Sequence, residues 1–155
     1  MKPLTPPSSR AALLLAGGLL ITLSNSASAL EYRNTGRPAI LYDAPSVDAG
    51  KLAVAGSGLP LEVVVDTAAW VKVRDYTGRL AWIEKSALGG PRNVMVKIDA
   101  GTVRQQPRTA APVAFRAARG VLLEVTGKPD ADGWVPVKHA DGLTGWIPER
   151  EVWGE

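Results

Sequence analysis

The runs WVKVR at residues 70–74 and WVPVK at residues 134–138 decide how this sequence folds. Each run alternates valine with larger or polar residues, which is typical of a β-strand with one buried face. Twelve residues after each tryptophan comes a Trp-Ile pair, at residues 82–83 and 146–147. The equal spacing predicts two copies of one β-hairpin, 64 residues apart.

The repeat continues upstream of the hairpins with a slightly different spacing. Residues 58–63 (GLPLEV) match residues 120–125 (GVLLEV) at an offset of 62. The difference falls in the loop before each tryptophan, where insertions cost little. Gly-Gly-Pro at residues 89–91 interrupts regular structure and marks the boundary between the copies. We therefore predict two units, residues 30–90 and residues 91–155.

Short runs rich in Val, Leu and Ile, separated by turn residues, predict five strands in each unit. The expected strands are residues 39–43, 51–55, 60–66, 70–75 and 79–84 in the first unit and 102–105, 113–117, 120–126, 134–139 and 143–148 in the second. A further alternating run at 94–98, with a weaker counterpart at 32–36, is expected to bridge the units or to extend a sheet edge. No run after residue 29 shows helical periodicity over three turns, so we predict an all-β fold of two tandem small β-barrels.

The turn residues predict the register of the hairpins. A three-residue loop that ends in a left-handed Gly78 places Val71 opposite Ile83, and the loop at residues 140–142 repeats this arrangement. Side chains alternate between the two faces of a strand. If the valines fill the core, the tryptophans of both strands point away from it.

These outward tryptophans allow two interpretations. The rings either cap the ends of the core in a strongly twisted sheet or form a binding surface, as exposed aromatic side chains often do. For Trp82 and Trp146 we expect caps. For Trp70 and Trp134, which lie beside variable loops, both interpretations stay open. Trp153 is expected either to plug the second unit or to make a contact.

The composition argues against catalytic and metal chemistry. The sequence has no cysteine and a single histidine, His139, which excludes thiol nucleophiles, thiolate metal sites and sites that need two histidines. No serine lies in a Gly-x-Ser-x-Gly or Ser-x-x-Lys motif. Asp130 and Asp132 have the pattern of a turn and lack the spacing of a calcium loop. We predict a protein that is not an enzyme and has no cofactor and no metal.

Residues 1–29 have the pattern of an export signal. Lys2 and Arg10 precede an apolar run at residues 11–23, and an Ala-x-Ala cleavage pattern stands at residues 27–29. The run of 13 residues is shorter than the roughly 20 that a spanning helix needs. We therefore expect cleavage before Leu30, a periplasmic or secreted mature chain and no stable membrane insertion.

The charge balance does not favour a nucleic-acid partner. Residues 1–29 hold two of the 18 basic residues and none of the 15 acidic residues, which leaves 16 and 15 after cleavage. The mature chain also has no run of Lys and Arg. Binding to phosphate backbones requires such clusters, so no nucleic-acid binding is expected.

The order of these motifs resembles the bacterial SH3 domain of exported proteins, in two tandem copies over nearly all of residues 30–155. The second unit is the closer match, with VRQQP at 103–107 and GWI at 145–147. The first unit has LYDAP at 41–45 and AWI at 81–83 in these places. The resemblance implies two SH3-like β-barrels that bind peptidoglycan or protein segments without catalysis. The tyrosine that completes the polyproline groove of eukaryotic relatives is missing, so polyproline recognition is not implied.

We therefore predict an exported, non-catalytic protein that binds a cell-envelope component, either a wall peptide or an envelope protein. The candidate ligand-binding residues are Tyr42, Trp70, Lys72 and Tyr76 in the first unit and Arg104, Trp134 and His139 in the second. Aromatic rings would supply apolar contact area, and the polar neighbours would orient the ligand. The alternative is a structural or assembly protein whose units pack on each other or on further copies; the oligomeric state is left open.

Overall fold

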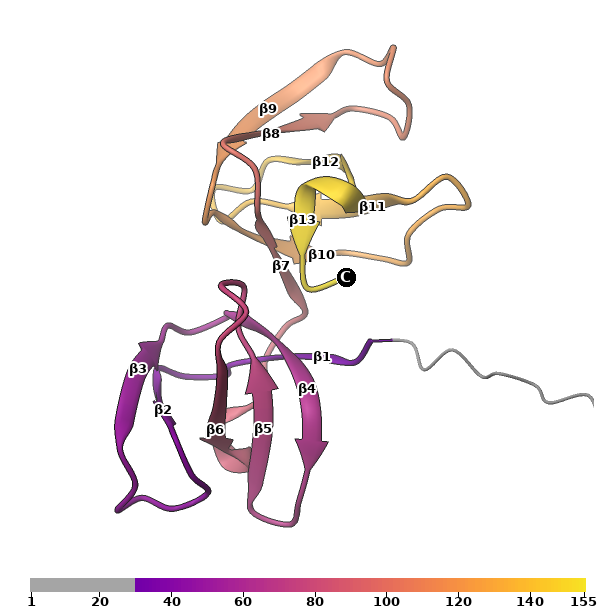
Figure 1. Ribbon diagram of the computed structural model, residues 1–155. Coiled ribbons are helices and arrows are strands. Elements are labelled where there is room, and N and C mark those ends of the chain that lie inside the picture. The colour runs from indigo at the N-terminus through magenta and orange to yellow at the C-terminus, as the bar shows by residue number, and fades with distance from the viewer. Residues whose placement is uncertain (1–29) are drawn as a thin grey trace, which may run out of the picture.

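The computed structural model describes residues 30–155, which form two β-sheet units placed one above the other (Figure 1). Residues 1–29, where the sequence predicts a signal peptide, lie outside the described residues. The first sheet contains the strands between residues 32 and 84, and the second contains those between residues 93 and 153. Within the described part of the chain, no helix has the length and apolar character needed to cross a bilayer.

Every strand pairing in the two sheets is antiparallel, and the predicted strands are present. The first sheet has the order β1-β4-β5-β6-β2-β3 and the second β13-β7-β10-β11-β12-β8-β9. The elements of the first unit are β1 (Tyr32–Asn34), β2 (Ala39–Tyr42), β3 (Lys51–Ala55), β4 (Pro60–Asp66), β5 (Trp70–Arg74), β6 (Leu80–Glu84) and the 3-10 helix η1 (Lys85–Ala87). Those of the second are β7 (Asn93–Val96), β8 (Ala100–Arg104), β9 (Val113–Ala118), β10 (Leu122–Val125), β11 (Trp134–Lys138), β12 (Thr144–Pro148), the 3-10 helix η2 (Glu149–Glu151) and β13 (Val152–Trp153). The all-β prediction is confirmed; β1 and β7 are the two further runs predicted at 32–36 and 94–98, and β13 is not among the predicted strands.

Neither sheet closes into the barrel that the sequence predicts. The end strands are β1 and β3 in the first unit and β13 and β9 in the second, and the two ends of a sheet are not hydrogen-bonded to each other. β1 has three residues and β13 has two. Strands this short do not complete the continuous ladder that a closed barrel needs. Each unit is therefore a curved, open sheet with two edge strands.

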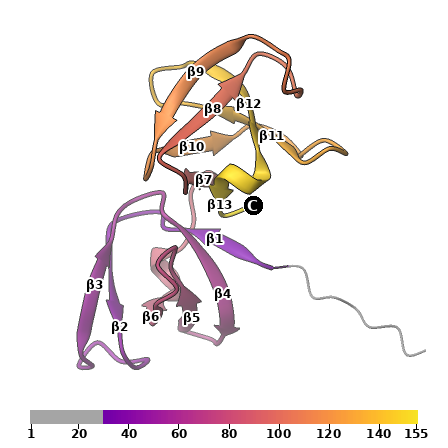
Figure 2. The same cartoon turned by 45° about the horizontal axis from the view of Figure 1, so that its top comes forward.

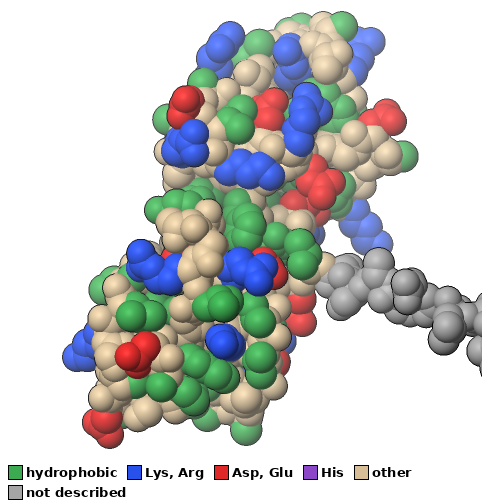
Figure 3. All heavy atoms as spheres, in the orientation of Figure 1, with side chains coloured by type: hydrophobic (Ala, Val, Ile, Leu, Met, Phe, Trp, Pro, Cys, Tyr) green, Lys and Arg blue, Asp and Glu red, His purple; other side chains and the backbone are tan. Residues whose placement is uncertain are grey.

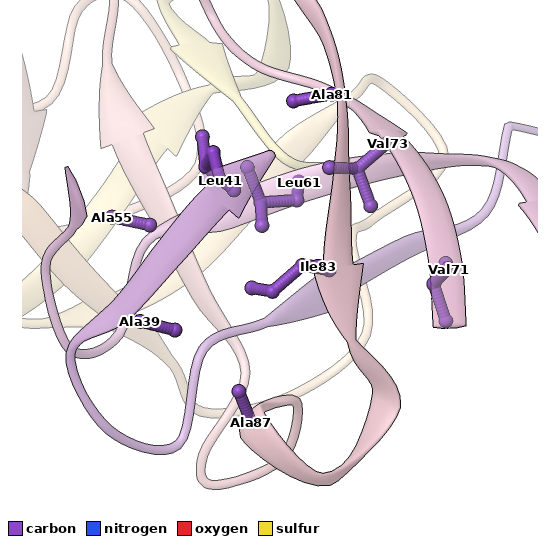
Figure 4. Close-up of a cluster of buried hydrophobic side chains, with 9 residues drawn as sticks. All are labelled: Ala39, Leu41, Ala55, Leu61, Val71, Val73, Ala81, Ile83 and Ala87. Atoms are coloured by element: carbon purple, nitrogen blue, oxygen red, sulfur yellow. The ribbon is translucent and has the colours of Figure 1, made fainter. Parts of the chain in front are cut away.

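The register of both hairpins agrees with the sequence prediction. Val71 lies opposite Ile83 and Val135 lies opposite Ile147, and all four side chains are completely buried. Gly78 has a φ of 86°, the left-handed conformation that the three-residue loop requires. Figure 4 shows the first core, which consists of Ala39, Leu41, Ala55, Leu61, Val71, Val73, Ala81, Ile83 and Ala87.

Two asparagine side chains join the two units around the carbonyl oxygen of Gly58. The Asn34 amide donates to the carbonyl oxygens of Gly58 (3.1 Å) and of Asn93 in the other unit (3.0 Å). The Asn93 amide donates back to the same Gly58 carbonyl at 3.3 Å. Because Asn34 lies on β1 and Asn93 on β7, these two strands connect the units at the junction.

Trp153 adds an aromatic contact across the junction. Its Nε1–H donates to the carbonyl oxygen of Pro60 at 3.2 Å. Its ring meets Tyr32 edge to face, with 5.2 Å between the ring centroids. Figure 2 shows β1 and β13 together at this boundary. Of the two interpretations of Trp153, contact with the other unit is the one the structure supports.

Candidate binding face

The outer face of the first sheet, opposite the valine core, carries a row of large side chains. Direct pairing places Tyr42, Trp82 and Lys72 side by side across β2, β6 and β5. Trp70 precedes Lys72 by two residues on β5, and therefore points to the same side. The predicted outward direction of Trp70 and Trp82 is confirmed. The row brings together three of the four candidate residues of this unit: Tyr42, Trp70 and Lys72.

Tyr42 and Trp70 form an aromatic pair within this row. Their ring centroids are 5.4 Å apart and their planes lie at 85°, an edge-to-face arrangement. Tyr42 is only 6% exposed, whereas Trp70 is half-buried. The packed indole leaves the Tyr42 ring almost no accessible surface, and the ligand contact predicted for Tyr42 stays a prediction. Tyr42 packs against Trp70, and the Trp70 ring is the one of the pair that a ligand can reach.

A hollow of about 220 Å³ lies beside this pair. It is lined chiefly by Arg37, Pro38, Ile40, Tyr42, Val54 and Glu84. Ile40 lies opposite Val54 in the β2–β3 ladder, and Val54 is 73% exposed. Arg37 and Glu84 approach each other to 4.0 Å at this hollow. Glu84 lies opposite Trp70, and Tyr42, which lines the hollow, packs on the Trp70 ring. The indole therefore adjoins the hollow, and we call the two together the peptide face.

Ile40 and Val54 were not among the residues predicted from the sequence. The signal that could have found them is alternation: with Leu41 in the core, Ile40 on the same strand points outward. Val54 follows once β3 is paired with β2, because directly opposite residues share a face. That pairing is a property of the folded sheet.

The remaining candidates of the first unit have different surroundings. Lys72 Nζ lies 6.0 Å from the centre of the Trp82 ring, a cation–π arrangement that occupies one face of the indole. Tyr76 lies in the turn after β5, at the opposite end of that strand from Trp70, and is 55% exposed. The structure therefore does not bring Tyr76 to the peptide face.

The second unit is polar where the first has its apolar hollow. Thr102 lies opposite Arg116 in the β8–β9 ladder, at the positions that Ile40 and Val54 occupy in β2 and β3. On the side of the molecule drawn in Figure 3, hydrophobic side chains gather on the lower, first unit, and several Lys and Arg side chains are scattered over the upper unit. The peptide face is therefore not duplicated.

Arg104 takes the place of Tyr42. It lies opposite Trp146, as Tyr42 lies opposite Trp82. Its guanidinium donates a hydrogen bond of 2.7 Å to the carbonyl oxygen of Ala111. The side chain thus braces the loop between β8 and β9, and the ligand contact predicted for it stays a prediction.

Trp134 is only 6% exposed, which is the burial that the cap interpretation expects, and its predicted ligand contact stays a prediction. The longer loop before it folds back on the strand: the Asp130 N–H donates to the Trp134 carbonyl (3.0 Å), and the Trp134 N–H donates to the Asp130 carboxylate (2.9 Å). Pro148 lies opposite Trp134, where the first unit has the charged Glu84 opposite Trp70. Trp134 is thus held by the loop through its backbone and is buried, so the second unit lacks an equivalent of the half-buried Trp70.

His139 belongs to the tip of the second hairpin, at the far end of β11 from Trp134. Its Nδ1 lies 2.8 Å from the Asp141 carboxylate, and its ring lies 5.9 Å from that of Phe115. A hydrogen bond from the backbone N–H of Leu143, together with His139, holds the pKa of the Asp141 carboxyl below its ordinary range. Within residues 30–155, no three His, Asp or Glu side chains gather as metal ligands.

Comparison with protein families agrees with this architecture. The bacterial SH3 domain family matches residues 35–90 and residues 97–154. Because these two segments cover most of the sequence, the chain belongs to the bacterial SH3 domain family and contains two tandem domains. The resemblance seen in the motif order is confirmed. Bacterial SH3 domains commonly bind cell-wall components.

No curated protein matches the sequence. Two solved structures from Trichomonas vaginalis are similar to the chain, both at 14% identity and a TM-score of 0.37. NlpC2 is matched over 84% of this chain and 50% of its own length. NlpC1 is matched over 89% of this chain and 50% of its own length. The chain thus spans half the length of these structures.

Proposed function

We propose that this chain is an exported, non-catalytic protein that binds an extended peptide of the cell envelope on the peptide face of its first domain. The peptide belongs to the wall or to an envelope protein. The observation that carries the proposal is the hollow lined by Ile40 and Val54, beside which the half-buried Trp70 packs on Tyr42. Membership in a family that commonly binds cell-wall components supports it.

The chemistry of the peptide face suits an extended chain. β3 is an edge strand, so its outer N–H and C=O groups have no ladder partner and are available to an added strand. Ile40, Val54 and Trp70 supply apolar contact area. Arg37 and Glu84 place one group of each charge at the hollow, where they can orient the polar groups of a peptide.

Export is supported by the pattern of residues 1–29, with its two basic residues, apolar run and Ala-x-Ala. We propose a periplasmic or secreted mature chain that starts at Leu30. Intact mass spectrometry of the protein recovered from the periplasm tests this. A recovered chain that still contains residues 1–29 contradicts it.

Binding without catalysis is supported by the ionisable groups near the hollow. Arg37 and Glu84 approach each other, and Tyr42 is covered by Trp70. None of these is a nucleophile held by a general base, which nucleophilic catalysis requires. His139 is engaged with Asp141 in a turn of the other domain.

Co-sedimentation with purified, protein-free peptidoglycan sacculi tests the wall-peptide form of this proposal. Trp70→Ala removes the open indole, and Val54→Asp places a charge on the apolar floor at a position that is 73% exposed and leaves the core intact. Both variants should lose binding, whereas Tyr76→Ala, an exposed aromatic outside the face, should bind as the wild type does. Equal binding by Trp70→Ala, Val54→Asp and wild type, with folding verified by circular dichroism, overturns the proposed site.

A parallel pull-down from envelope extract distinguishes a wall peptide from an envelope protein. Loss of one specific partner with Val54→Asp, but no binding to sacculi by any form, assigns the face to a protein segment. The competing function is assembly through the edge strand β3, whose Leu52 and Val54 are exposed. Light scattering that shows a stable oligomer, dissociated by Val54→Asp, favours assembly over peptide binding.

A further inference from the structure

The second domain has a hollow of its own on its outer face, about 350 Å³ in volume, around Trp146. It is lined chiefly by Gln105, Thr126, Pro136, Thr144, Gly145 and Trp146. Every residue that lines it is uncharged. This hollow lies on the other domain from the peptide face, so a ligand bound here would be additional to the proposed function and independent of it.

Trp146 and Pro136 form the apolar part of the hollow. They lie directly opposite each other on β12 and β11, so both side chains belong to the same face of the sheet. Pro136 is buried and Trp146 is half-buried, which leaves part of the indole accessible. Arg104 also lies opposite Trp146, but its guanidinium is bonded to the Ala111 carbonyl. No cation therefore occupies this indole from that side.

Three neutral polar side chains complete the hollow. Gln105, Thr126 and Thr144 are exposed, and none of them makes a side-chain hydrogen bond to another residue of the described chain. An amide and two hydroxyls together offer both donors and acceptors without any charge. Such groups pair well with ligand hydroxyls, which themselves donate and accept.

We propose that this hollow binds a neutral sugar ring, with the pyranose stacked on Trp146. One face of a pyranose exposes only C–H groups, which suit the electron-rich face of an indole. The hydroxyls at the edge of the sugar ring then pair with Gln105, Thr126 and Thr144. The lining contains no charged residue, and Lys138, which lies opposite Thr144, is outside it. An ionised group inside the hollow would therefore lose hydration without gaining a lining partner of opposite charge, which favours neutral over ionised sugars.

The first domain provides an internal comparison. There the equivalent indole, Trp82, has Lys72 Nζ 6.0 Å from its ring centre. The equivalent of Thr126 in the first domain is Val65, which is paired with Lys72. The equivalent of Thr144 is Leu80, which is paired with Arg74. With a cation over the ring and aliphatic neighbours, the first domain lacks both the open indole and the hydroxyls. The sugar site therefore belongs to the second domain alone.

A titration followed by NMR tests the inference on the whole protein labelled with ¹⁵N. The probes are triacetylchitotriose, cellotriose and trigalacturonate, and the readout is the five indole N–H signals. At least one of the two neutral trisaccharides should shift the Trp146 signal in a saturable manner and leave the Trp82 signal unchanged. The two neutral probes differ in their acetamido groups, so their ranking identifies the sugar type. Trigalacturonate should bind at least tenfold more weakly than the better neutral probe.

The double variant Thr126→Val/Thr144→Leu gives the second domain the side-chain chemistry of the first. It removes two hydroxyls at exposed positions and should weaken binding by about tenfold or more, since each hydrogen bond contributes modestly. Trp70→Ala is the matched control and should bind the sugar unchanged, so that failure of the peptide face and failure of the sugar site are separable. No saturable shift at Trp146, or sugar binding by the double variant as tight as that of the wild type, overturns the inference. Equally tight binding of trigalacturonate overturns the preference for a neutral ring.

Discussion

The two domains of this protein have matching cores and different outer faces. Leu61 and Leu123 occupy equivalent, fully buried positions. On the outer side, exposed Val54 on β3 is matched by exposed Arg116 on β9. Packing restricts what a core position accepts, whereas an exposed position on the same strand tolerates aliphatic or charged side chains. A duplicated fold can therefore present two unrelated surfaces on one scaffold.

A second difference concerns the strand that begins each sheet. β1 and the residue after it supply Arg33, Asn34 and Thr35, whereas the equivalent positions in β7 supply Val94, Met95 and Val96. In the first domain the buried polar groups are satisfied locally: the Thr35 hydroxyl accepts the Leu59 N–H at 2.9 Å. The Asn34 amide is used for the junction between the domains. A polar first strand thus allows one domain to dock the other.

The largest expected effect tests the likeness of the two cores. Leu61→Ala and Leu123→Ala each remove a fully buried side chain and should each lower the free energy of unfolding by about 2–5 kcal/mol. Urea unfolding followed by circular dichroism measures both. If one substitution costs less than about 1 kcal/mol, the two cores are not equivalently packed.

A difference between the cores appears at Gly145 and its equivalent, Ala81. A Cβ on Gly145 would lie 2.6 Å from both the Arg104 carbonyl oxygen and Val103 Cγ1. Because the backbone oxygen cannot easily move, Gly145→Ala should destabilise the protein by about 1–3 kcal/mol. Ala81→Gly, the reciprocal change, should cost only about 0.5–1 kcal/mol. Thermal unfolding of the two variants compares them, and an alanine at 145 with wild-type stability contradicts the close approach.

The junction predicts a smaller effect. Trp153→Ala removes the hydrogen bond to Pro60 and the ring contact with Tyr32, and should cost about 1–2 kcal/mol. The domains should then unfold in two separate calorimetric transitions, whereas the wild type should unfold in one. Trp153→Phe keeps the ring contact and serves as the control. A single transition in Trp153→Ala shows that the domains are coupled by other contacts.

The smallest effect concerns pH and only the first domain. Hydrogen bonds from Lys85 and then Arg33 hold the pKa of the Asp66 carboxyl below its ordinary range. The stability from this cluster is therefore present above the ordinary pKa of an aspartate and is lost as the pH falls through the lower folded value. In the second domain Val94 replaces Arg33 and Glu149 replaces Lys85, so this cluster of charges is present in the first domain alone.

Asp66→Asn should reduce the loss of stability between about pH 5 and pH 2, measured as the urea midpoint of the first domain at each pH. The exposure of the cluster keeps the effect small. If the acid-induced loss of stability is unchanged in Asp66→Asn, then other carboxylates cause that loss.

Much of the architecture follows from local sequence signals. The alternating valines and the three-residue loops at Gly78 and Gly142 predict the strands and the hairpin register, because alternation and turn geometry act over a few neighbouring residues. The face of each tryptophan follows from the same alternation. Local signals do not predict that the sheets stay open, because the lengths of β1 and β13 depend on where their hydrogen-bonded pairing with neighbouring strands ends.

Local residue patterns are therefore enough to predict the repeat, the strands, the register of the two hairpins and the face on which their side chains lie. The accessibility of the outward side chains depends on the folded molecule, in which Trp70 covers Tyr42, Trp134 is buried, Val54 is exposed and Trp153 contacts the first domain. The physical reason is that direction depends on the backbone of one strand. Exposure depends on side chains brought from other strands, loops and the second domain, and no local pattern specifies those neighbours.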